Sequence, residues 1–221
     1  MIVILEDLLD PIEVTRIRDT LARAQWQDGA NTAGRHARMV KNNEQAKGPD
    51  VDAARRLIAD ALARNEHFKM AALPRAMTPI MFSRYKPGME YGTHIDNAMM
   101  TSATGRMRCD LAMTVFLSDP ETYSGGGLSI SGIAQNEIRL PAGSAVLYPA
   151  TTLHRVTPVE SGERLAAILW VQSLVREDAA RETIYDLATA RRMLLDTEGK
   201  TEAFDLIAKS HANLMRRWAE V

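Results

Sequence analysis

Two residues near the middle of the sequence, His94 and Asp96, have the types and spacing of metal ligands. They stand in the stretch SRYKPGMEYGTHIDN, residues 83–97, downstream of the turn-forming pair Pro87 and Gly88. Residues i and i+2 of a β-strand point to the same face, so this imidazole and this carboxylate would project into one space. The alternative is two polar residues on the exposed face of a strand. The pair therefore predicts half of a metal site and needs another ligand.

A third ligand is available at His154, in the stretch YPATTLHRVTPV. Two histidines and one carboxylate can hold Fe(II) on one face, which leaves positions open for a co-substrate and oxygen. His154 is the only other histidine in the same β-rich part of the chain. The remaining histidines are expected to be solvated or hydrogen-bonded, or in the last case packed on a helix or at an interface: His36, His67 and His211.

Arg164 is placed where it could bind a carboxylate near the metal. It follows His154 by ten residues and begins a strongly apolar strand. A guanidinium can hold a carboxylate through two parallel hydrogen bonds. A dicarboxylate could thus be fixed at its far end by Arg164 while its near end chelates the metal. This arrangement predicts 2-oxoglutarate as the co-substrate.

The elements that must position these residues can be predicted from hydrophobic period. Asp10 before Pro11 indicates the start of a helix. Its inward face would carry Val14, Ile17, Leu21 and Ala24. A second helix is expected from about Pro49, with these residues inward: Val51, Ala54, Ile58, Ala61 and Leu62.

From residue 78 to 174 the pattern changes to short apolar or alternating runs separated by glycine and proline. About eight strands of this kind suit a double-sheet jelly roll. The expected strands are TPIMFSRY, YGTHID, DLAMTVFLS, GGLSISG, NEIRL, SAVLYPA, TLHRVTPV and RLAAILWVQSL. The stretch NAMMTSATGRM, residues 97–107, is interpreted as a mobile lid beside the site, with a plain surface loop as the alternative.

A helical period returns at the C-terminal end. One stripe carries Ile184, Leu187, Ala188, Leu194 and Leu195, and a second carries Phe204, Ile207, Ala208, Leu214, Met215 and Trp218. We therefore expect a single domain, residues 1–221, that is mainly β with flanking helices. Its jelly-roll core (a double-stranded β-helix) would span 78–175, and residues 176–221 would form a C-terminal helical extension. The two stripes also suggest a homodimer through these helices.

Composition narrows the classes of function. The chain has 221 residues, with 27 Lys and Arg against 28 Asp and Glu, so it lacks the basic field that nucleic-acid binding usually needs. The single cysteine, Cys109, excludes an internal disulfide and any multi-cysteine metal site. The N-terminus has no signal-peptide pattern, and no apolar run is long enough to span a bilayer. We expect a cytoplasmic protein with no membrane partner.

Three ordered segments resemble the PKHD-type hydroxylases, relatives of the prolyl and lysyl hydroxylases among the Fe(II)/2-oxoglutarate dioxygenases. They are SRYKPGMEYGTHID, TVFLSDPETYSGGGLSI and YPATTLHRVTPVESGERLAAILWVQS. The resemblance implies iron ligands at His94, Asp96 and His154, and a 2-oxoglutarate anchor at Arg164. It also implies co-substrate contacts from Tyr85 and Trp170, for which burial in the core is the alternative explanation.

The sequence departs from the family pattern at Gly127, where GGGL replaces GGEL, and at Asn97, where aspartate is common. Neither is a ligand position. The resemblance implies an enzyme that uses Fe(II), O2 and 2-oxoglutarate to hydroxylate a second substrate and releases succinate and CO2. Members of the family are commonly assigned L-ascorbate as a reductant, and relatives are associated with iron uptake.

Two other functions fit the same residues. A cupin-like metalloenzyme would use the roll and the ligands without 2-oxoglutarate, and the position of Arg164 argues against it. A non-catalytic module could bind a metal or a peptide, which an intact ligand set makes less attractive. The prime substrate, a protein side chain or a small molecule, is not specified by the sequence.

Overall fold

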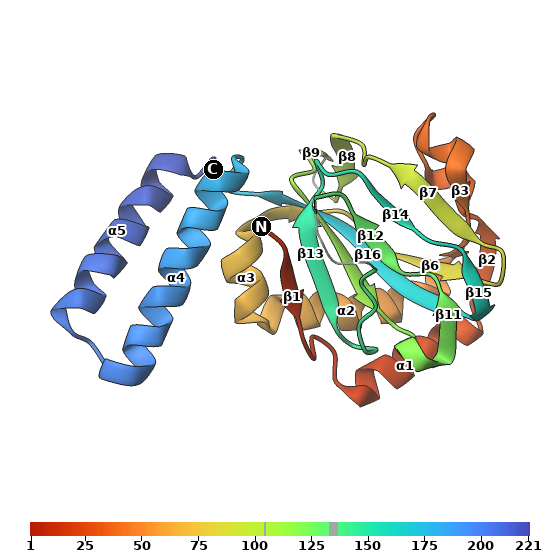
Figure 1. Cartoon of the computed structure of the whole chain (residues 1–221), viewed down its shortest axis with the longest axis horizontal. Coiled ribbons are helices and arrows are strands. Elements are labelled where there is room, and N and C mark those ends of the chain that lie inside the picture. The colour runs from red at the N-terminus through yellow and green to blue at the C-terminus, as the bar shows by residue number, and fades with distance from the viewer. Residues whose placement is uncertain (104, 133–136) are drawn as a thin grey trace.

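The computed structural model describes residues 1–103, 105–132 and 137–221. Two β-sheets pack face to face, helices cover the outer face of the larger sheet, and a helical hairpin extends from one end (Figure 1). This is the predicted fold class, a jelly roll with N-terminal and C-terminal helices.

The larger sheet is antiparallel and runs in the order β1-β13-β10-β16-β6-β4-β2, with β5 also paired to β16. Its strands are β1 (Val3–Leu5), β2 (Gln25–Asp28), β4 (Glu44–Lys47), β5 (Pro74–Met77), β6 (Met81–Tyr85), β10 (Leu111–Phe116), β13 (Ala145–Pro149) and β16 (Arg164–Ser173). The smaller sheet runs β12-β14-β7-β3. Its strands are β3 (Lys41–Asn42), β7 (Glu90–His94), β12 (Leu128–Ile130) and β14 (His154–Val156).

Strand β10 shows how the sequence builds two cores. All six of its residues are buried. Leu111, Met113 and Val115 join the core between the larger sheet and the helices, whereas Ala112 and Phe116 join the core between the two sheets. Because successive side chains of a strand alternate between faces, a strand that is covered on both sides is continuously apolar.

The N-terminal helices form close to where the sequence predicts them: α1 (Pro11–Ala22), α2 (Asp52–Arg64) and α3 (Glu66–Ala72). Asp10 accepts a hydrogen bond from the backbone N–H of Glu13 at 2.8 Å, and the Glu13 carboxylate accepts one from the N–H of Asp10 at 3.0 Å. This reciprocal cap fixes the start of α1. Ala24 lies beyond the end of the helix. Short 3-10 turns are η1 (Gly29–Thr32), η2 (Ala37–Val40), η3 (Pro49–Val51) and η4 (Pro120–Thr122).

The C-terminal hairpin consists of α4 (Asp178–Glu198) and α5 (Glu202–Trp218). Ile184 and Ala188 are buried, and Tyr185 shares a 2.6 Å hydrogen bond with His67 of α3, which ties α4 to the body. Leu195 is 49% exposed, so this part of the stripe does not pack against the sheet, and its contact with a second subunit stays a prediction. The predicted apolar stripe of α5 is half-buried.

A buried ion pair joins the chain's C-terminal end to the sheet. Arg108 donates to both carboxylate oxygens of Asp110, at 2.6 and 3.0 Å, and to Glu220 at 2.9 Å. Asp110 is 6% exposed and also accepts from the backbone N–H of Ser173 at 2.9 Å. The pair thus links three segments that are distant in sequence.

Two local predictions need correction. The stretch NEIRL forms only an isolated bridge between Ile138 and Leu128 in the described part of the chain, because the following Pro141 disfavours extension of the ladder; Asn136 lies outside the described residues. The predicted lid at 97–107 contains a hairpin, β8 (Met99–Ser102) with β9 (Gly105–Arg108), in which Met100 pairs with Met107. Thr104 of that stretch lies outside the described residues, and closure of the segment stays a prediction.

A second small hairpin is formed by β11 (Tyr123–Gly125) and β15 (Val159–Gly162). Among the described residues, every helix is too short or too polar to cross a membrane.

Candidate metal centre and co-substrate pocket

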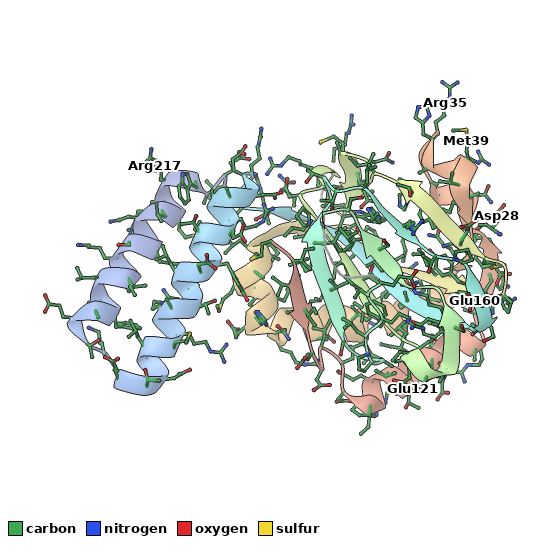
Figure 2. All side chains as sticks on the ribbon, viewed as in Figure 1. Asp28, Arg35, Met39, Glu121, Glu160 and Arg217 are labelled. Carbon is green, nitrogen blue, oxygen red and sulfur yellow. The ribbon has the colours of Figure 1, made fainter. Side chains whose placement is uncertain are left out.

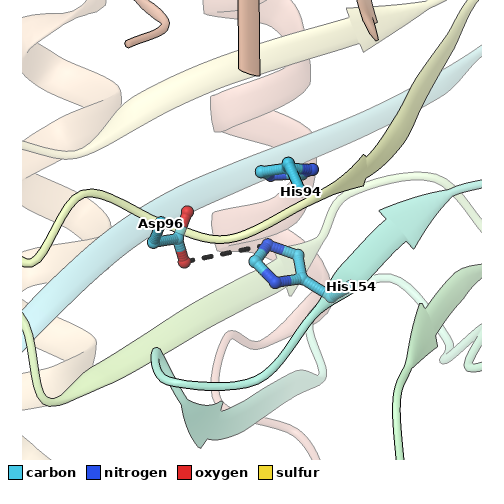
Figure 3. A group of neighbouring side chains, drawn as sticks. All are labelled: His94, Asp96 and His154. Carbon is cyan, nitrogen blue, oxygen red and sulfur yellow. Dashed lines mark ion pairs between the residues drawn. The ribbon is translucent and has the colours of Figure 1, made fainter. Parts of the chain in front are cut away.

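The predicted metal ligands meet at one end of the smaller sheet. His94 is the last residue of β7 and His154 the first of β14, and the two are direct cross-strand neighbours. Asp96 follows two residues after the end of β7, so it does not share a strand with His94 as predicted. The candidate donor atoms of the three side chains nevertheless lie within 4.8 Å of one another (Figure 3). No other cluster of three such side chains occurs in the described ranges.

Both histidine rings are held in one orientation. Nδ1 of His94 lies 2.8 Å from the carbonyl of Gly92, and Nδ1 of His154 lies 3.0 Å from the carbonyl of Thr152. A carbonyl only accepts, so we assign the proton to Nδ1 in each ring, which leaves Nε2 with a free lone pair. The Tyr91 ring stacks on His94 with 3.6 Å between centroids and fixes its plane. Such outer contacts are what a metal-binding histidine requires.

The carboxylate of Asp96 lacks a full set of partners. Its side chain is 7% exposed, and Oδ2 lies 3.7 Å from Nε2 of His154 (dashed in Figure 3), too far for a hydrogen bond. Oδ2 has no hydrogen-bond partner among the described residues. Burial raises the pKa of Asp96, and His154 opposes that shift. A buried carboxylate of this kind is stabilised by a cation.

Burial also favours the neutral, metal-binding form of His94. Its pKa falls to about 4, mainly through desolvation, with further lowering by His154 and Lys41. A neutral imidazole beside a free carboxylate oxygen is the donor set expected for a divalent transition metal. The residues present therefore fit an iron ion.

Arg164 lies deeper in the same pocket. Its side chain is 1% exposed, and none of its guanidinium nitrogens has a hydrogen-bond partner within the described residues. Its Cζ lies 5.2 Å from the ring centroid of Tyr85, its cross-strand neighbour, and 5.5 Å from that of Phe116. Burial raises the pKa of Tyr123, and its hydroxyl approaches the guanidinium closely enough to oppose that rise, but no described carboxylate pairs with Arg164. A buried cation without a counter-charge fits an anionic ligand, because an unpaired buried charge is otherwise costly.

Tyr85 and Trp170 complete this inner end. The Tyr85 side chain is fully buried, and neither its hydroxyl nor the indole N–H of Trp170 forms a hydrogen bond of normal geometry with a described residue. The indole nevertheless approaches Asp96 closely enough to lower the carboxyl pKa. These free donors and the Arg164 fork fit the carboxylates of a dicarboxylate such as 2-oxoglutarate.

All six residues singled out from the sequence therefore line one pocket: Tyr85, His94, Asp96, His154, Arg164 and Trp170. Sequence reasoning missed a further part of the lining, which comes from η1, η2, β3 and β4 and includes Lys41, Asn43 and Gln45. No strand is predicted from the sequence for that segment. Its signal was the alternation of polar residues at 41, 43 and 45, which is the period of a strand.

The two positions that depart from the family pattern, Gly127 and Asn97, lie in different places relative to the metal pocket. A side-chain carbon at Gly127 would lie 2.3 Å from the Cβ of Glu137, so the glycine leaves room for that glutamate outside the metal pocket. Asn97 does line the metal pocket, and its amide packs against Gly34, where an added Cβ would lie 2.7 Å from Oδ1. Only the Asn97 departure therefore touches the site.

Comparison with known proteins gives the family. Residues 80–172 match the profile of the 2OG-Fe(II) oxygenase superfamily. The chain is 48% identical over 223 residues to a PKHD-type hydroxylase of Synechococcus elongatus, with 100% of both chains covered. It belongs to the PKHD-type hydroxylases. A PKHD-type hydroxylase of Acaryochloris marina is 48% identical over 224 residues, again with 100% of both chains covered. The chain is thus an Fe(II)- and 2-oxoglutarate-dependent hydroxylase.

Solved structures share the fold. A viral collagen prolyl hydroxylase from Paramecium Bursaria Chlorella virus-1, solved as a 2OG complex, superposes with a TM-score of 0.54 at 20% identity and covers 78% of this chain and 95% of its own. A Pseudomonas putida prolyl-4-hydroxylase gives 0.53 at 16% identity, with 77% and 92% covered. At these identities the likeness supports the architecture alone.

Proposed function

We propose that His94, Asp96 and His154 are the iron ligands of this hydroxylase. The observation that carries the proposal is that the three side chains each bring a candidate donor atom to within 4.8 Å of the others, and that Oδ2 of Asp96 has no hydrogen-bond partner among the described residues. A ferrous ion bound there would supply the oxygen-activating chemistry that couples decarboxylation of 2-oxoglutarate to hydroxylation of a second substrate. The protein's own part is to hold both rings in one orientation through the backbone carbonyls described above, while burial keeps His94 neutral.

We further propose that Arg164 anchors the far carboxylate of 2-oxoglutarate, with Tyr85 and Trp170 as additional donors. Support comes from the free donors of these side chains and from their burial, which excludes competing water. A bidentate guanidinium bond fixes both the position and the rotation of a carboxylate. Arg164 would thereby orient the co-substrate toward the metal ligands before oxygen enters.

The reaction that we propose is hydroxylation of an unidentified peptidyl side chain or small molecule, with release of succinate and CO2. L-Ascorbate as a reductant, a link to iron uptake and a cytoplasmic location belong to the same hypothesis. We assign catalysis to residues 78–175 and treat 176–221 as a helical extension. The exposed Met193, Leu195 and Leu206 of that extension support homodimerisation through it.

Metal stoichiometry tests the ligand assignment. Wild type should bind one Fe(II) per chain under anaerobic conditions, and His94→Ala, Asp96→Ala and His154→Ala should each lose most of the affinity. His36→Ala, at an exposed histidine outside the pocket, is the matched control and should bind as wild type does. Full occupancy in all three ligand variants would end the assignment.

A further inference from the structure

A stripe of polar side chains lines the same pocket as Arg164 and the metal ligands, where the chain passes from the smaller sheet to the larger one. It consists of Lys41 on β3, Asn43 in the link to β4, and Gln45 on β4. These residues alternate with Asn42 and Glu44, which is the spacing that turns every second side chain to one face of extended chain. The stripe lies outside residues 80–172, the part that matches the superfamily profile.

Lys41 brings a free positive charge into this wall. Its ammonium donates to Oγ1 of Thr32 at 3.1 Å and lies 5.0 Å from the ring centroid of Tyr91, the ring that stacks on His94. It forms no ion pair with any described residue. Burial lowers the pKa of Lys41 to about 8, against opposing effects from Asp96 and Asp28. The group therefore stays protonated at neutral pH, with donors to spare.

The amides of the stripe are only partly satisfied by hydrogen bonds. Asn43 and Gln45 are each 3% exposed. Neither the oxygen nor the nitrogen of the Asn43 amide, nor the nitrogen of the Gln45 amide, forms a hydrogen bond of normal geometry with a described residue, although the Asn43 amide lies close enough to the Tyr85 hydroxyl to oppose the rise of its pKa on burial. The Gln45 oxygen accepts from Thr32 at 2.6 Å, which also steadies the hydroxyl that holds Lys41. Buried amides are normally satisfied, so this wall is built for a polar ligand.

The balance of charges in the pocket indicates what kind of ligand Lys41 would bind. When Fe(II) and 2-oxoglutarate are both bound, their formal charges cancel, and Arg164 balances Asp96. Among the charged residues that line the pocket, Lys41 alone is then left without an opposite charge. Arg35, on the same N-terminal segment, projects outward from the tip in Figure 2, so it does not serve the pocket.

We propose that Lys41 is the specificity-determining anchor for a carboxylate on the prime substrate. The inference rests on the proposed function, because it takes Arg164 to be occupied by 2-oxoglutarate. A single ammonium beside a hydroxyl and an aromatic ring suits one carboxylate, and the free amides of Asn43 and Gln45 suit neighbouring polar groups of the same molecule. The preferred substrate is thus an amino acid, a peptide with an acidic residue or chain end, or another carboxylate-bearing molecule.

The test uses two simple probes, N-acetylglycine and its uncharged amide, N-acetylglycinamide. Each is titrated calorimetrically into the full chain loaded anaerobically with Fe(II) and saturating 2-oxoglutarate. N-acetylglycine should bind wild type at least about tenfold more tightly than the amide, as one charge-assisted hydrogen bond predicts. Lys41→Met should erase this preference, and Lys41→Arg should keep part of it. Lys47→Met, at an exposed lysine outside the pocket, is the matched control and should keep all of it.

The outcomes separate this inference from the proposed function. If wild type binds no 2-oxoglutarate, the proposed function fails. If 2-oxoglutarate binds but the acid and the amide probes bind equally, the inference about Lys41 is wrong. It is also wrong if Lys41→Met retains the preference, since the carboxylate then contacts the metal or another group. Displacement of 2-oxoglutarate by N-acetylglycine would overturn it too, because the probe would then occupy the Arg164 site.

Discussion

Replacement of Arg164 by an apolar residue should weaken 2-oxoglutarate binding without lowering the free energy of unfolding. A buried arginine that supports the fold normally has hydrogen-bond partners, and its removal destabilises the protein. Arg164 has none of normal geometry among the described residues and only the Tyr123 hydroxyl nearby, although its side chain is 1% exposed. Without co-substrate it is an uncompensated buried charge, and an apolar side chain of similar length should be tolerated or stabilising. Arg164→Met should therefore leave the free energy of unfolding unchanged or raise it.

The same substitution should remove most of the affinity for 2-oxoglutarate. A bidentate, charge-assisted contact is worth several kcal/mol, so a loss of about 100-fold or more, roughly 2.7 kcal/mol, is expected. Arg164→Lys should recover only part of the affinity, because an ammonium lacks the planar fork. Arg155→Ala, at an exposed arginine of β14 outside the pocket, is the matched control.

The assay is anaerobic titration of the Fe(II) protein with 2-oxoglutarate, followed by the absorption band of the chelate, alongside chemical unfolding of the ligand-free protein. If Arg164→Met binds 2-oxoglutarate as tightly as wild type, another residue anchors the carboxylate. If the variant loses affinity only in proportion to a large loss of stability, Arg164 is structural and the argument from its free donors is refuted.

The remaining predictions concern stability and pocket shape. Asp110→Ala should cost about 1–3 kcal/mol in the free energy of unfolding, because Arg108 and the backbone N–H of Ser173 both lose a buried acceptor. Glu220→Gln, on the exposed side of the same guanidinium, should cost clearly less, and equal losses in urea unfolding would contradict this. Because the pKa of His94 falls to about 4 in the fold, the unfolded metal-free chain takes up the extra proton, and up to about 3 kcal/mol of stability should be lost as pH falls from about 6.5 to about 4. His94→Gln should lack this part of the pH dependence, so identical slopes would disprove it. At Gly126, where φ is +63° and an added Cβ would lie 3.1 Å from Cδ of Arg164, an alanine should weaken 2-oxoglutarate binding more than Fe(II) binding, and parallel losses of both would argue against a local effect.

Much of the fold follows from local chemistry that the sequence displays. The cap formed by Asp10 and the continuous apolar run of β10 each depend on nearby residues, so their signals survive in the linear pattern. The exposure of Leu195 near the end of α4 does not follow from nearby residues, because it depends on how far the hairpin extends beyond the body. The hairpin at 99–108 was missed because its strands are half polar and owe their pairing to each other.

The candidate site likewise contains residues that the sequence predicts and residues that it does not. His94, Asp96 and His154 have a characteristic spacing, so types and order alone suffice to single them out. Lys41 and Asn43 come from a segment without such a pattern, and only the pairing of β3 with β7 brings Lys41 opposite Tyr91, beside the metal ligands. Long-range pairing of this kind is set by the whole sheet, so the alternation at 41, 43 and 45 could indicate a strand but not that the strand lines the pocket.

The measurement that tests the central claim most directly is formation of succinate from 2-oxoglutarate by the purified chain with Fe(II) and oxygen, without any prime substrate. The proposed centre predicts slow, iron-dependent succinate production that stops on chelation, returns when Fe(II) is restored, and is absent in His154→Ala. Production that persists in His154→Ala, or none from a wild-type chain that has bound both Fe(II) and 2-oxoglutarate, would contradict the proposed metal centre.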